Sequence, residues 1–141
     1  MAIKIKKILV PLDGSSNSFR GLDVAIHMAR ESHSTITGLY VAGIVKPRTS
    51  DSITPLEKIL LNHAQKIMKK AKSLAAQKGI LFFDQVSYGD DGKRIVEVAE
   101  KQNFDLIVIG SRGMGAAKEL FLGSTSNYVL HKSKKPVLIV K

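Results

Sequence analysis

The order of apolar and polar positions changes repeatedly between two patterns along the chain. Short apolar runs rich in β-branched residues predict strands at 3–10, 35–41, 80–88, 106–109 and 136–140. Between these runs, apolar residues recur at every third or fourth position, which is typical of amphipathic helices. We expect four helices, which begin near Ser16, Pro55, Asp91 and Ser124.

The longest predicted helix runs from Thr54 or Pro55 to Gln77. Gly79 follows it and suits a left-handed cap at its end. The expected apolar face of this helix consists of Leu56, Leu60, Ala64, Ile67, Ala71 and Leu74.

The alternation of strands and helices predicts an α/β fold, a five-stranded parallel sheet with helices on both faces. Unbroken apolar strands such as 106–109 suit a sheet that is covered on both sides. The length of 141 residues fits one domain, against about 100–200 residues for a typical domain. We therefore expect residues 1–141 to form a single domain.

Composition excludes several classes of protein. The chain has no cysteine, which excludes disulfides, thiolate catalysis and iron–sulfur clusters. The net charge is +10, but the lysines are spread along the chain and there are only five Phe, three Tyr and no Trp. These numbers favour a solvated basic surface over a nucleic-acid-binding module. No apolar run suits a signal peptide or a membrane span, so we expect a cytoplasmic protein without membrane contact.

Two loops that follow strands carry the candidate chemistry, because open α/β sheets bind ligands at the carboxyl ends of their strands. The first loop covers residues 11–16, and the second runs from 110 to 115 and continues to a helix start at 123–126. The second loop has glycines at 110, 113, 115 and 123, and it carries Arg112. Glycines let a backbone approach a ligand, and a helix start with small hydroxyl residues favours an anion. This loop therefore predicts a phosphate cradle, although it lacks the P-loop pattern.

Simpler interpretations stay open at this stage. Ser124 could only cap the last helix, and Asp13 could cap the first helix or accept hydrogen bonds from a ribose. Asp90 and Asp91 suit helix capping better than metal binding. No metal site and no catalytic residues are expected, since the histidines show no ligand spacing and lie outside both loops, at His27, His33, His63 and His131.

The spacing Gly110-x2-Gly113-x9-Gly123-Ser124 resembles the ATP-binding signature of the universal stress proteins. Residues 7–15, 105–113 and 136–140 are also similar to that family, and the resemblance covers the whole chain in order. It implies a Rossmann-like or flavodoxin-like fold with strand order 3-2-1-4-5 and an ATP site between the ends of strands one and four. It also implies a homodimer, for which the apolar strand five would offer a free sheet edge.

The resemblance assigns a role to individual residues. Pro11 and Asp13 would border the adenosine, and the backbone of Val41 would face the adenine. The ribose and phosphates would be surrounded by the residues of the second loop, namely Gly110, Arg112, Gly113, Gly115, Gly123, Ser124 and Thr125. Mg²⁺ would be held through the phosphates. Thr125 and Tyr128 stand where the family often has aliphatic residues, which leaves the packing of the last helix in question.

The residues also favour this strand order without the resemblance. If the two loops form one site, strands one and four must be neighbours, which the order 3-2-1-4-5 provides and 2-1-3-4-5 does not. Our leading hypothesis is an ATP-binding universal stress protein that acts as a nucleotide-dependent switch. An ATP hydrolase is the first alternative. Its turnover would be slow, because neither loop offers a clear residue to orient the attacking water. A basic nucleic-acid-binding module is the second.

Overall fold

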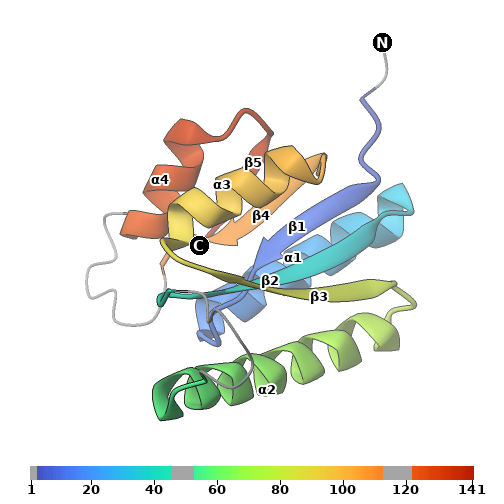
Figure 1. Cartoon of the computed structure of the whole chain (residues 1–141). Coiled ribbons are helices and arrows are strands. Elements are labelled where there is room, and N and C mark those ends of the chain that lie inside the picture. Colours follow the sequence, from blue (N-terminus) through green and yellow to red (C-terminus); the bar gives the residue numbers. More distant parts are fainter. Residues whose placement is uncertain (1–2, 46–52, 113–121) are drawn as a thin grey trace.

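The computed structural model describes residues 3–45, 53–112 and 122–141. Its parallel sheet has the order β3-β2-β1-β4-β5, which confirms the predicted fold class and strand order (Figure 1). The strands are β1 (Lys7–Pro11), β2 (Thr35–Ala42), β3 (Phe82–Tyr88), β4 (Leu106–Gly110) and β5 (Val137–Val140).

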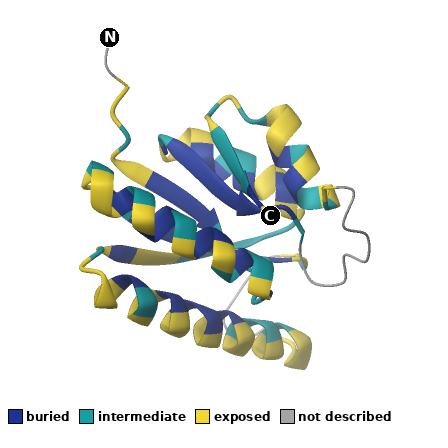
Figure 2. Ribbon diagram, turned by 180° about the vertical axis from the view of Figure 1, so that it is seen from behind, coloured by how far each residue is buried: buried dark blue, intermediate teal, exposed yellow. Residues whose placement is uncertain are grey.

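Two helices cover each face of the sheet. On one face, α1 (Ser16–Ser32) and α2 (Pro55–Gln77) pack over a core with β1 and β2. On the other face, α3 (Asp91–Lys101) and α4 (Ser124–Lys132) pack over a second core with β4. The buried residues lie on the central strands and on the inward sides of the helices (Figure 2). None of the described helices is long and apolar enough to cross a membrane.

Most element boundaries agree with the prediction, and the first strand shows why one does not. We expected a strand from residue 3, but β1 begins at Lys7, where the pairing with Thr35 of β2 also begins. Ile3 is 86% exposed. The backbone N–H groups of Lys6 and Lys7 both donate to the carboxylate of Asp105, at 2.9 and 3.0 Å. The carbonyl of Lys6 still accepts from the N–H of Thr35 at 2.9 Å, and residues 3–5 lie before the paired part of β1.

The apolar face expected for α2 is also shorter than the spacing predicts. Leu56 is 57% exposed, and the first buried residue of the helix is Ala64. The spacing of apolar residues identifies the inward side of a helix but not the length over which a neighbour covers it. At the other end, Gly79 has a φ of +72°, so the predicted left-handed cap is confirmed.

Candidate functional site

The two candidate loops lie at the same edge of the sheet because their strands are neighbours. β1 pairs with β4 through Ile8–Leu106 and Leu9–Ile107, so the carboxyl ends of both strands point the same way. Val41 lies at the end of β2, on the other side of β1. Gly113 and Gly115, two of the predicted site residues, lie outside the described residues.

The loop between β1 and α1 is a tight turn held by its own side chains. The carboxylate of Asp13 accepts a hydrogen bond from the N–H of Ser15 at 2.9 Å. Gly14 adopts a φ of +90°, a conformation that favours glycine. Ser15 is the N-cap of α1, and its hydroxyl accepts from the N–H of Ser18 at 3.0 Å. Asp13 therefore shapes the turn, and the capping role belongs to Ser15.

Pro11 is the last residue of β1 and is half-buried beside this turn. Its register partner in β2 is Leu39, whose carbonyl accepts from the N–H of Leu12 at 2.9 Å. Because proline has no N–H, it donates no ladder hydrogen bond at this position. The register thereby places the Asp13 turn directly beyond the paired part of β1.

Asn17 connects the first loop to the second, a contact that our sequence analysis did not predict. Its Oδ1 accepts from the backbone N–H of Arg112 at 2.7 Å. Its Nδ2 donates to the carbonyl of Val140 at 3.2 Å. A Cβ on Gly110 would lie 2.5 Å from the same Oδ1 and 2.9 Å from the backbone oxygen of Asn17. Gly110 is thus required where the start of α1 meets the end of β4.

The two ends of the connection between β4 and α4 are joined at Ser111. Its carbonyl accepts from the N–H of Gly123 at 2.7 Å and lies 2.8 Å from the hydroxyl of Ser126. Its own N–H donates to the carbonyl of Val140 at 2.7 Å. Ser111 and Ser126 are buried. The start of α4 is therefore fixed against the end of β4.

The start of α4 differs from that of the other described helices. Ser15, Thr54 and Asp90 each cap their helix with a side-chain hydrogen bond, whereas Gly123 of α4 provides none. A helix start has N–H groups without intrahelical partners and a partial positive charge, so it attracts anions. The start of α4 therefore offers what a phosphate needs, which is free N–H donors and a partial positive charge.

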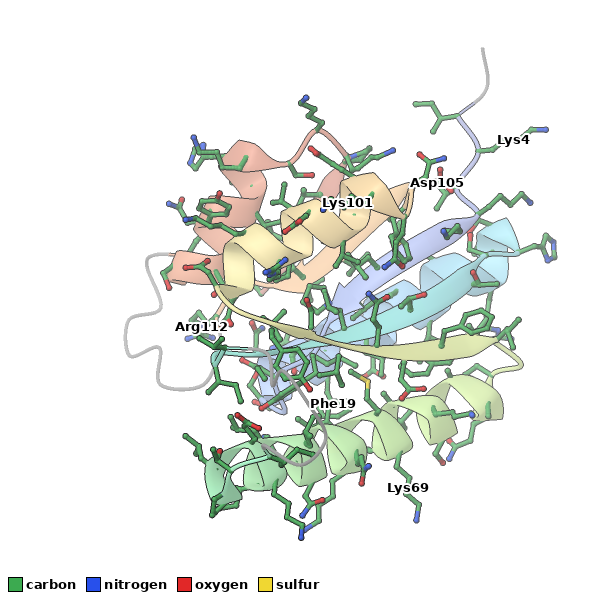
Figure 3. The ribbon with its side chains drawn as sticks, in the orientation of Figure 1. Lys4, Phe19, Lys69, Lys101, Asp105 and Arg112 are labelled. Atoms are coloured by element: carbon green, nitrogen blue, oxygen red, sulfur yellow. The ribbon has the colours of Figure 1, made fainter. Side chains whose placement is uncertain are left out.

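Three of the predicted residues surround this N-terminus. Ser124 is exposed and Thr125 is half-buried in the first turn of α4. Arg112 is half-buried at the end of β4, and Figure 3 shows it at the carboxyl edge of the sheet. Its backbone N–H is bound to Asn17, so that hydrogen bond does not involve the guanidinium. The guanidinium supplies a fixed positive charge at the edge that also holds Asp13.

Carboxylates and a tyrosine gather at the ends of β1, β2 and β3. Partial burial and the charges of Asp90 and Asp13 raise the pKa of Asp91, although the residue as a whole is exposed. Burial, followed by the charges of Asp91 and Asp13, raises the pKa of Tyr40. These acidic groups repel a bare polyphosphate, whereas they suit the hydroxyl and amino groups of a nucleoside, which donate hydrogen bonds.

The described residues contain no cluster of three His, Cys, Asp or Glu side chains that could hold a metal ion. Asp90 caps α3 by accepting from the N–H of Lys93 at 3.3 Å, as predicted. His63 lies closer to the candidate site than its position in the sequence suggested. Its ring meets that of Tyr40 edge-on at 6.0 Å, and its Nε2 would lie 3.3 Å from a Cβ on Gly14.

The packing of α4 accommodates the large side chain of Tyr128. A Cβ on Gly92 of α3 would lie 2.7 Å from the Tyr128 ring. The large side chain therefore fits because its neighbour on α3 is a glycine. The helix keeps its place beside α3, and its first turn keeps its place at the sheet edge.

Comparisons with known proteins agree with this geometry. The model of the Universal stress protein family matches residues 4–141. The universal stress protein YxiE of Bacillus subtilis is 34% identical, over 96% of this chain and 98% of its own length. The structure of universal stress protein UspA from Lactobacillus plantarum has a TM-score of 0.85 and 25% identity, over 98% of this chain and 99% of that one. A universal stress protein solved in complex with cAMP has a TM-score of 0.78 and 26% identity, over 96% and 97%.

Proposed function

We propose that this chain, which belongs to the universal stress protein family, binds ATP or another adenine nucleotide at the carboxyl edge of β1 and β4. The observation that carries the proposal is the uncapped start of α4, which lies at the same edge as Arg112 and Asp13. The relative solved with cAMP bound supports the choice of an adenine nucleotide.

The residues divide into a nucleoside side and a phosphate side. Pro11 and Asp13 border the adenosine, and the backbone of Val41 faces the adenine. The phosphates bind at the start of α4 and at the guanidinium of Arg112. The phosphate side includes the remaining predicted residues, which are Gly110, Gly113, Gly115, Gly123, Ser124 and Thr125. Mg²⁺ is held through the phosphates and offsets their charge.

The same contacts suggest how a nucleotide would act as a switch. Asn17 ties the start of α1 to Arg112 and Val140, so one amide side chain joins both loops to the end of β5. A nucleotide that draws the phosphate side and the nucleoside side together would move the start of α1 and the end of β5 through the hydrogen bonds of Asn17. A ligand shifts such an equilibrium only by its difference in affinity for the two states.

Three further properties are part of this proposal. Residues 1–141 act as one domain in the cytoplasm and form a homodimer through the free edge of β5. That edge is apolar, and an apolar sheet edge is prone to pair with a second copy. Sedimentation equilibrium of the full chain would show a dimer, and a monomer at micromolar concentrations would contradict this part of the proposal.

Identification of the bound nucleotide tests the main proposal. The purified chain is denatured, and the released small molecules are identified by mass, while calorimetry measures the binding of ATP, AMP, cAMP and GTP with Mg²⁺. We expect an adenine nucleotide to copurify or to bind, and GTP to bind more weakly. Steady-state phosphate release then distinguishes a binding protein from a hydrolase. A chain that neither carries nor binds any adenine nucleotide would disprove the proposal.

A further inference from the structure

The outer face of α2 carries an unbalanced positive charge that has no part in the nucleotide site. The helix contains five lysines and a single acidic residue, Glu57. Glu57 is already engaged, because its carboxylate accepts from the N–H of Thr54 at 3.3 Å in a capping box. All five lysines are exposed, namely Lys58, Lys66, Lys69, Lys70 and Lys72.

One of these lysines contacts an aromatic ring of the same chain. The ammonium of Lys70 lies 4.3 Å from the centre of the Phe19 ring of α1. Within the described parts of the chain, the ion pairs are Arg94–Glu97 and Lys101–Glu97, so no lysine of α2 takes part in one. Figure 3 shows Lys69 pointing away from the body of the molecule. Four cations on this helix are therefore available to a partner.

Exposed large apolar side chains also lie on this helix, but only at its beginning. Leu56 and Ile59 are 57% and 65% exposed in the first two turns, and Ile53 just before the helix is 43% exposed. When a partner covers such side chains, the free energy of binding gains roughly 25 cal/mol for each Å² of apolar surface that leaves contact with water. Farther along the helix, an open depression is lined by Asn62, Gln65, Lys66 and Lys69.

We propose that this face of α2 docks an acidic segment of another protein, with apolar side chains at one end of the segment and carboxylates along the rest. We call this stripe the α2 surface and define it by Leu56, Ile59, Lys66 and Lys69, which follow one another along the helix at spacings of three, seven and three residues. The apolar end of the segment packs on Leu56 and Ile59, and its carboxylates lie along the lysines. From Leu56 to Lys69 this surface is about 20 Å long at 1.5 Å per residue, which an extended segment of about six residues matches.

The observations favour this partner over three others. In a symmetric contact between two copies at α2, the lysines of this face would meet the same lysines of the copy and repel them, whereas the proposed dimer forms at β5. A bilayer surface suits a helix whose apolar residues run along its whole length, whereas here they occupy only the first two turns. A nucleic acid would use the lysines but would leave Leu56 and Ile59 without a role, and the α2 surface offers no aromatic side chain for stacking.

Photo-crosslinking from Gln65 identifies the partner. Gln65 is exposed and lines the same depression as Lys66 and Lys69, so a photoreactive amino acid at this position faces the docked chain and leaves both lysines in place. The full-length chain is irradiated in its own cells, and the crosslinked peptides are sequenced. We expect an acidic segment with apolar residues at one end, and its synthetic peptide is then measured by fluorescence anisotropy.

Matched variants separate the α2 surface from overall charge. The double variant Lys66→Glu with Lys69→Glu should weaken the peptide by about tenfold or more, because two attractions become repulsions. The double variant Lys4→Glu with Lys134→Glu changes the net charge equally at exposed positions elsewhere and should leave the affinity within about twofold. Leu56→Ser with Ile59→Ser should also weaken it by about tenfold. Thermal unfolding checks that all variants fold.

Two results would overturn the proposal. The first is that no acidic protein segment crosslinks at Gln65, or that its peptide binds the variant Lys66→Glu with Lys69→Glu as well as the original chain. The second is that vesicles of phosphatidylcholine and phosphatidylglycerol in equal parts, or a short DNA duplex, bind the α2 surface more tightly than the peptide does. Neither result bears on the nucleotide site, because no residue that defines the α2 surface is among the residues proposed to bind the nucleotide.

Discussion

Two helices begin at the same edge of the sheet, and they begin in different ways. α1 starts at a serine whose hydroxyl caps the helix, after a turn that is closed by Asp13. α4 starts at a glycine that offers no side-chain hydrogen bond, although its position is fixed just as firmly through Ser111. The first helix start satisfies the N–H of Ser18 with a side chain of the protein, whereas the cap residue of the second offers no such hydrogen bond. The difference suggests that α1 supports the site and that α4 binds the ligand.

The largest effect should come from the close contact that both helix starts share. In the variant Gly110→Ala, the new Cβ would lie 2.5 Å from the Oδ1 of Asn17 and 2.9 Å from its backbone oxygen. The helix must move, and such overpacking costs about 1–3 kcal/mol of the free energy of unfolding. Urea denaturation measures this loss. Gly43→Ala is the matched control, because no atom lies within 4 Å of its new Cβ, and an equal loss in both variants would contradict the account.

Arg112 allows the charge at the phosphate side to be removed without disturbing the fold. Its structural hydrogen bond comes from the backbone N–H, so Arg112→Ala keeps that bond. A hydrogen bond to a charged group contributes about 1.5–3 kcal/mol, so ATP should bind roughly 10–100-fold more weakly. Calorimetry checks this, with Arg20→Ala as the control for the loss of one exposed positive charge. Similar ATP affinities for the two variants would speak against a phosphate at Arg112.

The two caps can be exchanged to test the comparison itself. Ser15→Ala should destabilise the chain by about 1 kcal/mol, because α1 loses its cap. Gly123→Ser gives α4 a capping side chain at a position whose φ of −64° any residue can adopt. This variant should stabilise the chain by about 0.3 kcal/mol. The same variant should weaken ATP, since the new hydroxyl competes with the phosphates for the N–H groups. Unfolding and calorimetry of both variants measure these effects, and an unchanged ATP affinity in Gly123→Ser would mean that α4 binds no phosphate.

The smallest effect is a dependence of stability on pH at the acidic groups of the same edge. Burial and the charges of Asp90 and Asp13 raise the pKa of Asp91 above its ordinary value of 3.8. The folded chain therefore holds this proton more tightly than the unfolded chain, and the resulting stability is lost as the pH rises through the raised pKa. Asp91→Asn removes this contribution. The free energy of unfolding of the original chain, measured with urea, should fall relative to that of the variant as the pH rises through the raised pKa of Asp91. If the two free energies change with pH in the same way, Asp91 does not have a raised pKa.

The sequence predicted the strand order and both loops because their signals are local. Apolar runs, glycines and the Gly110–Ser124 spacing can be read within a few residues, and the order of the strands follows once the two loops share a site. The contacts of Asn17 could not be read in this way, since its partners Arg112 and Val140 lie 95 and 123 positions away in the chain. A single polar residue near a helix start carries no sign of which distant backbone it will meet.

The exposed start of α2 escaped prediction for a related reason. Leu56 has the spacing of a core residue, yet its burial depends on whether another element reaches the first turn. The same holds for His63, whose neighbours Gly14 and Tyr40 come from the β1–α1 loop and from β2. Tertiary contacts of this kind depend on how far helices extend beyond the sheet, and local periodicity contains no such information.

Amide chemical shifts during a titration with ATP and Mg²⁺ test the central claim most directly. The account predicts that the largest shifts occur at the N–H groups of Ser124, Thr125 and Arg112, with smaller ones around Asp13, while Lys66 and Lys69 on the outer face of α2 stay unchanged. Shifts that are largest outside the carboxyl edge of β1 and β4, or a spectrum that ATP leaves unaltered, would contradict it.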